Sequence, residues 1–256
     1  MTTPPGDHVL EWAGRHRQLT LHLTPERAAY WPAERTLFVA DMHLGKAAVF
    51  RARGLPVPQG TTTATLARLS AVIERVEARC LVVLGDFLHA KESHAPATMR
   101  ALQAWRSRHA DVACHVVRGN HDRHAGDVAS ALGFTPMREP YIRSALIGVH
   151  EAHEAWPHLM HGDPLDTLVL TGHTHPVAEL RGRVDRLRLP CYHLTQNLKQ
   201  NLTQNLSQGT AHVLTLPAFG AFTGGHPVDL GEPGSSVFVI GDGSVQPLHL
   251  KHAAPP

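Results

Sequence analysis

Four short polar segments, each directly after an apolar segment, constrain this sequence more than any other feature. The apolar segments TLFVA, CLVVL, CHVVR and TLVLT are typical of buried strands. The polar segments read DMH from residue 41, GDFLH from residue 85, GNHD from residue 119 and GHTH from residue 172. Because ligands collect beyond the carboxyl ends of strands in open α/β sheets, we expect these polar side chains to meet in one crevice.

The chemistry of these side chains indicates a metal site. Side chains at positions i and i+2 of a strand point the same way, so Asp41 should project together with His43, and His173 with His175. The donors are carboxylates, imidazoles and one amide oxygen, without cysteine. This mixture suits Mn²⁺, Fe or Zn²⁺ and argues against a closed thiolate zinc site. The Asp, His and Asn side chains of the four polar segments are therefore candidate metal ligands.

The histidine that completes this set can stand at either of two positions. His150 ends the apolar segment ALIGV, as the other candidates end theirs. His161 begins His-Gly-Asp, but the preceding EAWPHLM is not a clear strand. We favour His150 and keep His161 as the alternative.

The order DxH, GDxxH, GNHD, H and GHTH resembles that of the calcineurin-like metallophosphoesterases over residues 36–176. The resemblance implies two divalent metal ions, Mn²⁺ or else Fe or Zn²⁺. It places Asp41, His43, Asp86 and His175 on the first ion, and Asp86, Asn120, His150 and His173 on the second. Hydroxide activated by both ions would attack the phosphorus of a phosphodiester.

The same resemblance assigns catalytic roles around the metals. His121 would face the substrate, where it stabilises developing charge or protonates the leaving alkoxide. Asp122 would orient the His121 ring, and His89 would support the ligands without binding a metal.

Longer segments resemble the ligase-associated DNA damage response endonucleases of the PdeM family over residues 19–225. They are DMHLGKAAVFRARGLPVPQGTTTATLARL, GDFLHAKESH, GHTHPV, LRLPCYHL and LPAFGAFTGG. This resemblance implies a DNA substrate and a functional association with a DNA ligase, and its spacing before GHTH also favours His150. The segment TQNLKQNLTQNLSQG departs from the family pattern.

Charge composition bears on the substrate. The net charge of +2 is too small to indicate a nucleic-acid partner by itself. Arginine greatly outnumbers lysine and its planar fork fits phosphate, although a GC-rich genome explains the excess equally well. The candidate substrate-binding residues are Lys46, Arg51, Arg53 and Arg123, which follow ligand motifs.

The alternating pattern predicts a single α/β domain over residues 1–256, built as a four-layer αββα sandwich. Helices are expected at residues 60–79, 95–109 and 126–132, a flexible loop at 195–209 and a frayed tail at 251–256. The three cysteines fit free thiols in a reducing cytoplasm, and neither a transmembrane helix nor a signal peptide is predicted.

Two other functions remain open from the sequence. The motifs are compatible with a phosphodiesterase or phosphatase acting on small nucleotides. A scaffold that kept the fold and lost its metals is also conceivable, but the full ligand set argues against it.

Overall fold

The computed structural model describes residues 3–52, 54–57, 60–128, 130–138, 140–161, 163–182, 185–196 and 211–248. The helices are α1 (Lys46–Ala52), α2 (Thr61–Val76), α3 (Pro96–Arg108), α4 (Asn120–Ala125) and α5 (Trp156–Met160). The strands of the first sheet are β1 (His8–Ala13), β2 (Gln18–Leu23), β3 (Ala29–Trp31), β4 (Thr36–Val39), β5 (Cys80–Leu84), β6 (Ala113–Val117) and β7 (Phe134–Met137). The other strands are β8 (Tyr141–Arg143), β9 (Leu146–Gly148), β10 (Leu168–Thr171), β11 (Pro176–Arg181), β12 (Arg186–Thr195), β13 (His212–Thr215), β14 (His226–Pro227), β15 (Ser236–Gly241) and β16 (Ser244–Pro247).

The strands form two sheets. The first has the order β1-β2-β3-β4-β5-β6-β7, and β4, β5, β6 and β7 run parallel to one another. The second follows the order β14-β11-β12-β13-β10-β9-β8, with β15 attached to β12 and β16 attached to β15. Within it β9, β10 and β13 are parallel neighbours.

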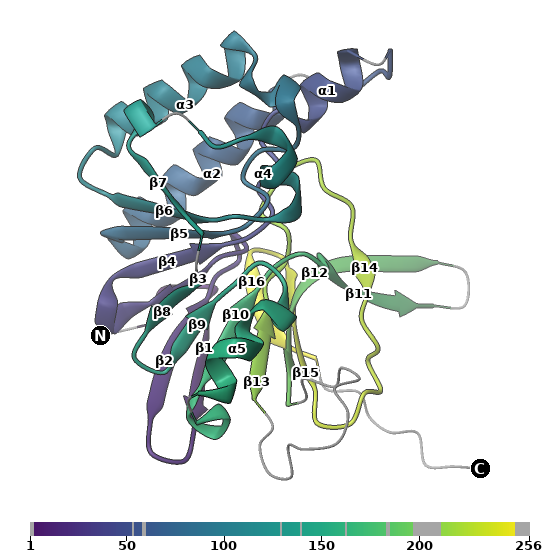
Figure 1. Cartoon of the computed structure of the whole chain (residues 1–256). Helices are drawn as coiled ribbons and strands as arrows, with labels where there is room; N and C mark the ends of the chain where they lie inside the picture. Colours follow the sequence, from purple (N-terminus) through teal and green to yellow (C-terminus); the bar gives the residue numbers. More distant parts are fainter. Residues whose placement is uncertain are drawn as a thin grey trace.

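Three apolar layers separate the four structural layers. Along β5, Leu81 and Val83 pack under α2 and α3, whereas Val82 and Leu84 face the second sheet. This alternation follows from the strand period of two residues. A third layer joins the outer face of β9, β10 and β13 to the short helix α5 through Leu159. The predicted αββα sandwich is therefore confirmed, with α2 and α3 over one sheet and α5 against the other (Figure 1).

Five strand ends meet at one edge of this sandwich. Asp41, Asp86 and Asn120 follow β4, β5 and β6, while His150 and His173 follow β9 and β10. The turns after β4 and β5 also bind each other through backbone hydrogen bonds from residue 41 to residue 85 and from residue 43 to residue 86. The fold thus brings the polar segments of both sheets together.

Two of the three predicted helices are present in the structure, and one is not. The helix expected at residues 60–79 is α2, which ends where Glu77 adopts a left-handed backbone with φ +51°. The helix expected at 95–109 is α3, which begins at a proline. The helix expected at 126–132 was wrong, because Gly126 has φ +87° and the described residues of this range form only a 3₁₀ turn, Ser130–Leu132. The elements that were missed are β1, β3, β7, β8, β14, β16, α1, α4 and α5.

Four further expectations concern the chain outside the site. Cys80, Cys114 and Cys191 are free thiols. None of the helices in the described ranges combines the length and apolar character that crossing a bilayer requires. The expected loop at 195–209 lies outside the described residues apart from its first two positions, and the expected tail at 251–256 lies outside them entirely.

Candidate metal centre

Two histidines and a carboxylate form the first half of the centre. His175 Nε2 lies 3.4 Å from Asp41 Oδ1, and His43 Nε2 lies 3.4 Å from His175 Nε2. The potential ligand atoms of all three residues fall within 4.8 Å of one another. They come from the turns after β4 and β10, so this half spans both sheets.

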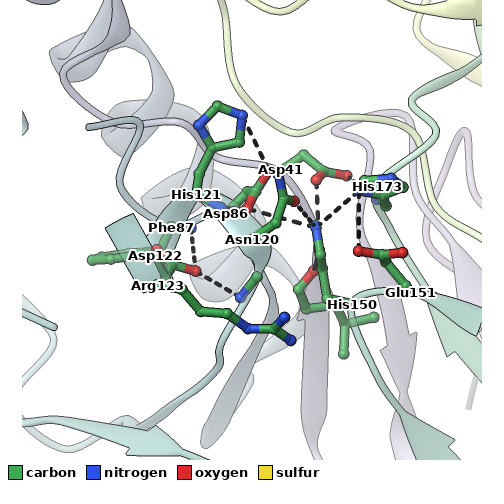
Figure 2. A network of polar contacts seen from close by, with 12 residues as sticks. Asp41, Asp86, Phe87, Asn120, His121, Asp122, Arg123, His150, Glu151 and His173 are labelled. Carbon is green, nitrogen blue, oxygen red and sulfur yellow. Dashed lines mark hydrogen bonds and ion pairs between the residues drawn. The ribbon is translucent and has the colours of Figure 1, made fainter. Parts of the chain in front are cut away.

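The second half is built around His150. Its Nε2 lies 2.9 Å from Asn120 Oδ1 and 3.1 Å from His173 Nδ1 (Figure 2). Its Nδ1 donates a hydrogen bond of 3.1 Å to the carbonyl of Leu84. Because Nδ1 carries the proton, the neutral ring presents the lone pair of Nε2 to the site, as a metal ligand must. His161 instead stands at the exposed end of α5, so it is His150 that lies among the other candidates.

Asp86 lies between the two halves. Its Oδ2 is 3.6 Å from His43 Nε2, and its Oδ1 is 3.5 Å from His150 Nε2. Oδ1 also accepts the backbone N–H of His121 at 2.9 Å. One carboxylate therefore offers an oxygen to each half, which is the position expected for a bridging ligand.

The ligands reach the site through left-handed turns. Asp41, His43, Asp86, His173 and His175 all have φ between +45° and +69°. Such values are uncommon outside glycine and concentrate at functional sites. Asp41 and His43 do project to the same place, as expected. The expected reason, strand alternation, was wrong, because both residues lie beyond the strand and left-handed turns direct their side chains.

Glycines of the motifs make room for carboxylates from other motifs. A Cβ on Gly119 would lie 2.3 Å from Asp86 Oδ1. A Cβ on Gly172 would lie 2.6 Å from Asp41 Oδ2. Since real Cβ atoms do not approach so closely, any other residue at these positions would displace a candidate ligand.

Electrostatics also suit a cation. Asp41 Oδ1 is buried and has no hydrogen-bond partner within the described part of the chain. Burial, followed by the nearby Lys46 and neighbouring histidines, lowers the pKa of His43 to about 2. Burial raises the pKa of Asp86. Metal binding favours deprotonated carboxylate and neutral imidazole, so the donor set fits divalent ions.

The surroundings of His121 correct one expectation. The His121 ring donates from Nδ1 to the carbonyl of His89 at 2.8 Å and stacks on the His89 ring with 4.7 Å between centroids. The Asp122 carboxylate does not orient this ring. It accepts backbone N–H groups of Phe87, Leu88 and Gly119 at 3.0–3.2 Å. Asp122 therefore joins the turns after β5 and β6, because three peptide donors converge on its buried oxygens.

The expected substrate-binding residues are scattered around the centre. Lys46 begins α1, half-buried, and its backbone N–H binds the carbonyl of His43 at 3.1 Å. Arg51 is exposed near the end of α1, and Arg53 lies outside the described residues. Arg123 donates to Glu154 at 2.7 Å and points away from His121 (Figure 2).

Two acidic residues beside the ligands were not predicted from the sequence. Glu154 accepts the backbone N–H of His150 at 3.2 Å, so it helps to hold the turn after β9. Glu151 Oε1 lies 4.0 Å from His173 Nδ1 and belongs to a possible metal-binding group with His150 (Figure 2). The motif HEAHE from residue 150 was the available signal.

An αββα sandwich with carboxylates, imidazoles and an amide converging at its strand ends defines a metal-dependent phosphoesterase. The family model for calcineurin-like phosphoesterases matches residues 34–204, and the chain belongs to this family.

Among solved structures, the Pseudomonas putida nuclease MPE is similar at 36% identity with a TM-score of 0.72, over 94% of this chain and 100% of its own. The phosphoesterase Yfce from E. coli is 16% identical with a TM-score of 0.36, over 82% of this chain and 95% of its own. No curated protein matches the sequence.

Proposed function

We propose that this phosphoesterase is a DNA endonuclease that uses two divalent ions, with Mn²⁺ as the preferred metal. The observation that carries the proposal is the clustering of seven candidate ligands in two halves with Asp86 between them, in a chain similar along nearly its whole length to a nuclease. We further propose a role in ligase-associated DNA repair in the cytoplasm, which the PdeM-like segments and three free thiols support.

The residues of the centre have distinct tasks in this reaction. Asp41, His43 and His175 would hold one ion, and Asn120, His150 and His173 the other, with Asp86 shared between them. Bound ions would lower the pKa of a water molecule and neutralise charge on the phosphodiester. Gly119 and Gly172 keep the carboxylates in place by leaving space where a Cβ would collide with them.

His121 is suited to act on the leaving group. Its Nδ1 is engaged by the carbonyl of His89, so only Nε2 is available to the site. Nε2 lies 4.0 Å from Asp86 Oδ2, and the side chain is 36% exposed, so a substrate can reach it. As imidazolium, His121 would donate the Nε2 proton to the leaving alkoxide.

A groove beside the centre favours a polymeric substrate. It has a volume of about 600 Å³, and its lining includes Arg118, Arg123 and Arg138. Arg118 and Val149, which also line it, directly precede the segments that carry Asn120 and His150. Arg118 and Arg123 pair with Asp127 and Glu154, so a phosphate flanking the cleaved bond would share these arginines with the carboxylates or bind Arg138.

The first experiment compares substrates. Single-stranded, nicked and duplex DNA are incubated with the protein and Mn²⁺, beside cyclic nucleotides and an aryl phosphodiester. We expect internal cleavage of DNA. Turnover of small nucleotides alone would instead identify a small-molecule phosphodiesterase, and no turnover with no bound metal would identify a metal-free scaffold.

The second experiment tests whether basic residues around the centre bind the phosphates of DNA. Charge reversal at Arg51, Arg53 or Arg138 should weaken DNA cleavage and spare a small aryl phosphodiester. The slope of log K against log salt should fall by about 0.7 per lost contact on single strands. Arg17→Glu is the matched control, because Arg17 lies in the β1–β2 turn beside Leu165, at the amino-terminal end of β10 and away from the centre. Equal effects of all variants on DNA cleavage would exclude a phosphate-binding role for Arg51, Arg53 and Arg138.

A further inference from the structure

Two phenylalanines stand apart from the apolar core. Five of the seven, Phe38, Phe87, Phe134, Phe219 and Phe238, are buried. Phe50 on α1 and Phe222 in the loop after β13 are partly exposed and belong to none of the core clusters among the described residues. Core packing therefore does not account for the positions of these two rings.

These two rings begin a continuous aromatic row that ends at the metal centre. The Phe222 and Phe50 centroids are 5.8 Å apart with an interplanar angle of 79°, and Phe50 stacks on His89 at 6.1 Å and 30°. His89 stacks in turn on His121 at 4.7 Å and 23°. His121 lies 4.0 Å from Asp86, so the row leads from the surface to the candidate bridging carboxylate.

A cationic side chain accompanies the row. Lys46, one turn before Phe50 on α1, lines a small surface depression together with His43 and Phe222. A phosphate held at the metal centre would carry its neighbouring nucleotide past this lysine to the exposed rings. Aromatic faces beside a cationic groove are the usual means of binding single-stranded nucleic acid.

We propose that Phe50 and Phe222 form a stacking subsite for one nucleobase next to the cleaved phosphodiester. The proposal rests on the nuclease function proposed above. A base inside a duplex is already stacked on its neighbours, so only an unpaired or extruded base can lie against these rings. The subsite therefore directs the enzyme to single strands, gaps and frayed ends.

The test is a double-mutant cycle between protein and substrate. One oligonucleotide of defined sequence is compared with copies that carry a single abasic nucleotide at successive positions around the cleaved bond. Cleavage efficiency, kcat/KM, is measured for the wild-type protein, for Phe50→Leu and Phe222→Leu, and for Phe50→Trp, which keeps an aromatic face. Leu55→Ala is the matched control, because Leu55 is 49% exposed on the same segment and has no ring.

We expect one abasic position to lower the wild-type kcat/KM roughly 5- to 150-fold, the range of base–aromatic stacking. The leucine variants should lose a similar factor on the intact strand and show no further loss at that abasic position, while Phe50→Trp and Leu55→Ala behave as wild type. Equal losses on intact and abasic strands would show that the rings only pack the loops, and would overturn the proposal. If wild-type protein cleaves no DNA, the nuclease function itself fails, which is a separate outcome.

Discussion

Substitution of Gly85 by alanine tests the packing of the metal centre directly. Gly85 has φ +77°, and an added Cβ would lie 2.1 Å from Nδ1 and 2.4 Å from Cγ of His150. Non-bonded carbon atoms prefer about 3.5–4.0 Å, so the His150 ring must move by more than about 1 Å. That ring is fully buried and its Nδ1 donates to the Leu84 carbonyl, so movement breaks this hydrogen bond.

Two effects set the magnitude for Gly85→Ala. A left-handed backbone costs an alanine about 1–2 kcal/mol. Overpacking a filled site costs about 1–3 kcal/mol more. The free energy of unfolding should thus fall by about 2–5 kcal/mol, less than the 5–15 kcal/mol typical of a folded domain. The variant should fold, but a displacement of about 1 Å at a ligand should lower activity about 10²-fold and weaken metal binding.

Gly243→Ala is the matched control. Gly243 has φ +70° and no heavy atom within 4 Å of an added Cβ, so it shares the backbone strain without the collision. Urea unfolding followed by tryptophan fluorescence, metal content and phosphodiester hydrolysis are measured for both variants. We expect Gly243→Ala to lose only about 1–2 kcal/mol and to keep its metals and activity. Equal destabilisation of the two variants with full activity of Gly85→Ala would refute the reasoning.

Four further outcomes are expected. With free metal at about 100 times Kd, each occupied site should raise Tm by about 5–11 °C, so removal of the metal by a chelator should lower Tm by that amount in differential scanning fluorimetry. His121→Ala should keep its metals but cleave DNA about 10²–10⁴-fold more slowly. The loss should be smaller for aryl phosphodiesters, whose leaving group needs no proton. An equal loss on DNA and on aryl phosphodiesters would favour charge stabilisation over proton donation. His150→Ala should strip a metal in elemental analysis and His161→Ala should not; the reverse would reassign the ligand. Burial raises the pKa of Cys114 to about 11 and of Cys191 to about 12, so both should resist iodoacetamide at pH 8 until the protein unfolds, and rapid native labelling would contradict this.

Local sequence was sufficient to predict the main elements near the centre. The apolar segments became β4, β5, β6 and β10, and helical periodicity located α2 and α3 to within a few residues. These predictions succeed because strand and helix periods are properties of neighbouring residues. The candidate ligands could be named for the same reason, since each follows one of these strands.

Short elements beside the ligands could not be predicted in this way. The helices α1 and α4 are seven and six residues long, too short to show an apolar period. The left-handed turns at Asp41 and Asp86 depend on backbone hydrogen bonds between the loops after β4 and β5, which no local pattern contains.

Tertiary structure alone decided what each polar group does once the segments meet. Sequence adjacency suggested that Asp122 orients His121, but three converging peptide N–H groups capture its carboxylate instead. Arg123 follows a ligand motif, yet it pairs with Glu154 from the 3₁₀ turn that follows β9. Similarly, Phe50 meets Phe222 only because two loops distant in sequence fold against each other. The sequence therefore determined which chemical groups gather at the strand ends, and long-range packing determined their partners, because a side chain bonds to whatever lies nearest in space.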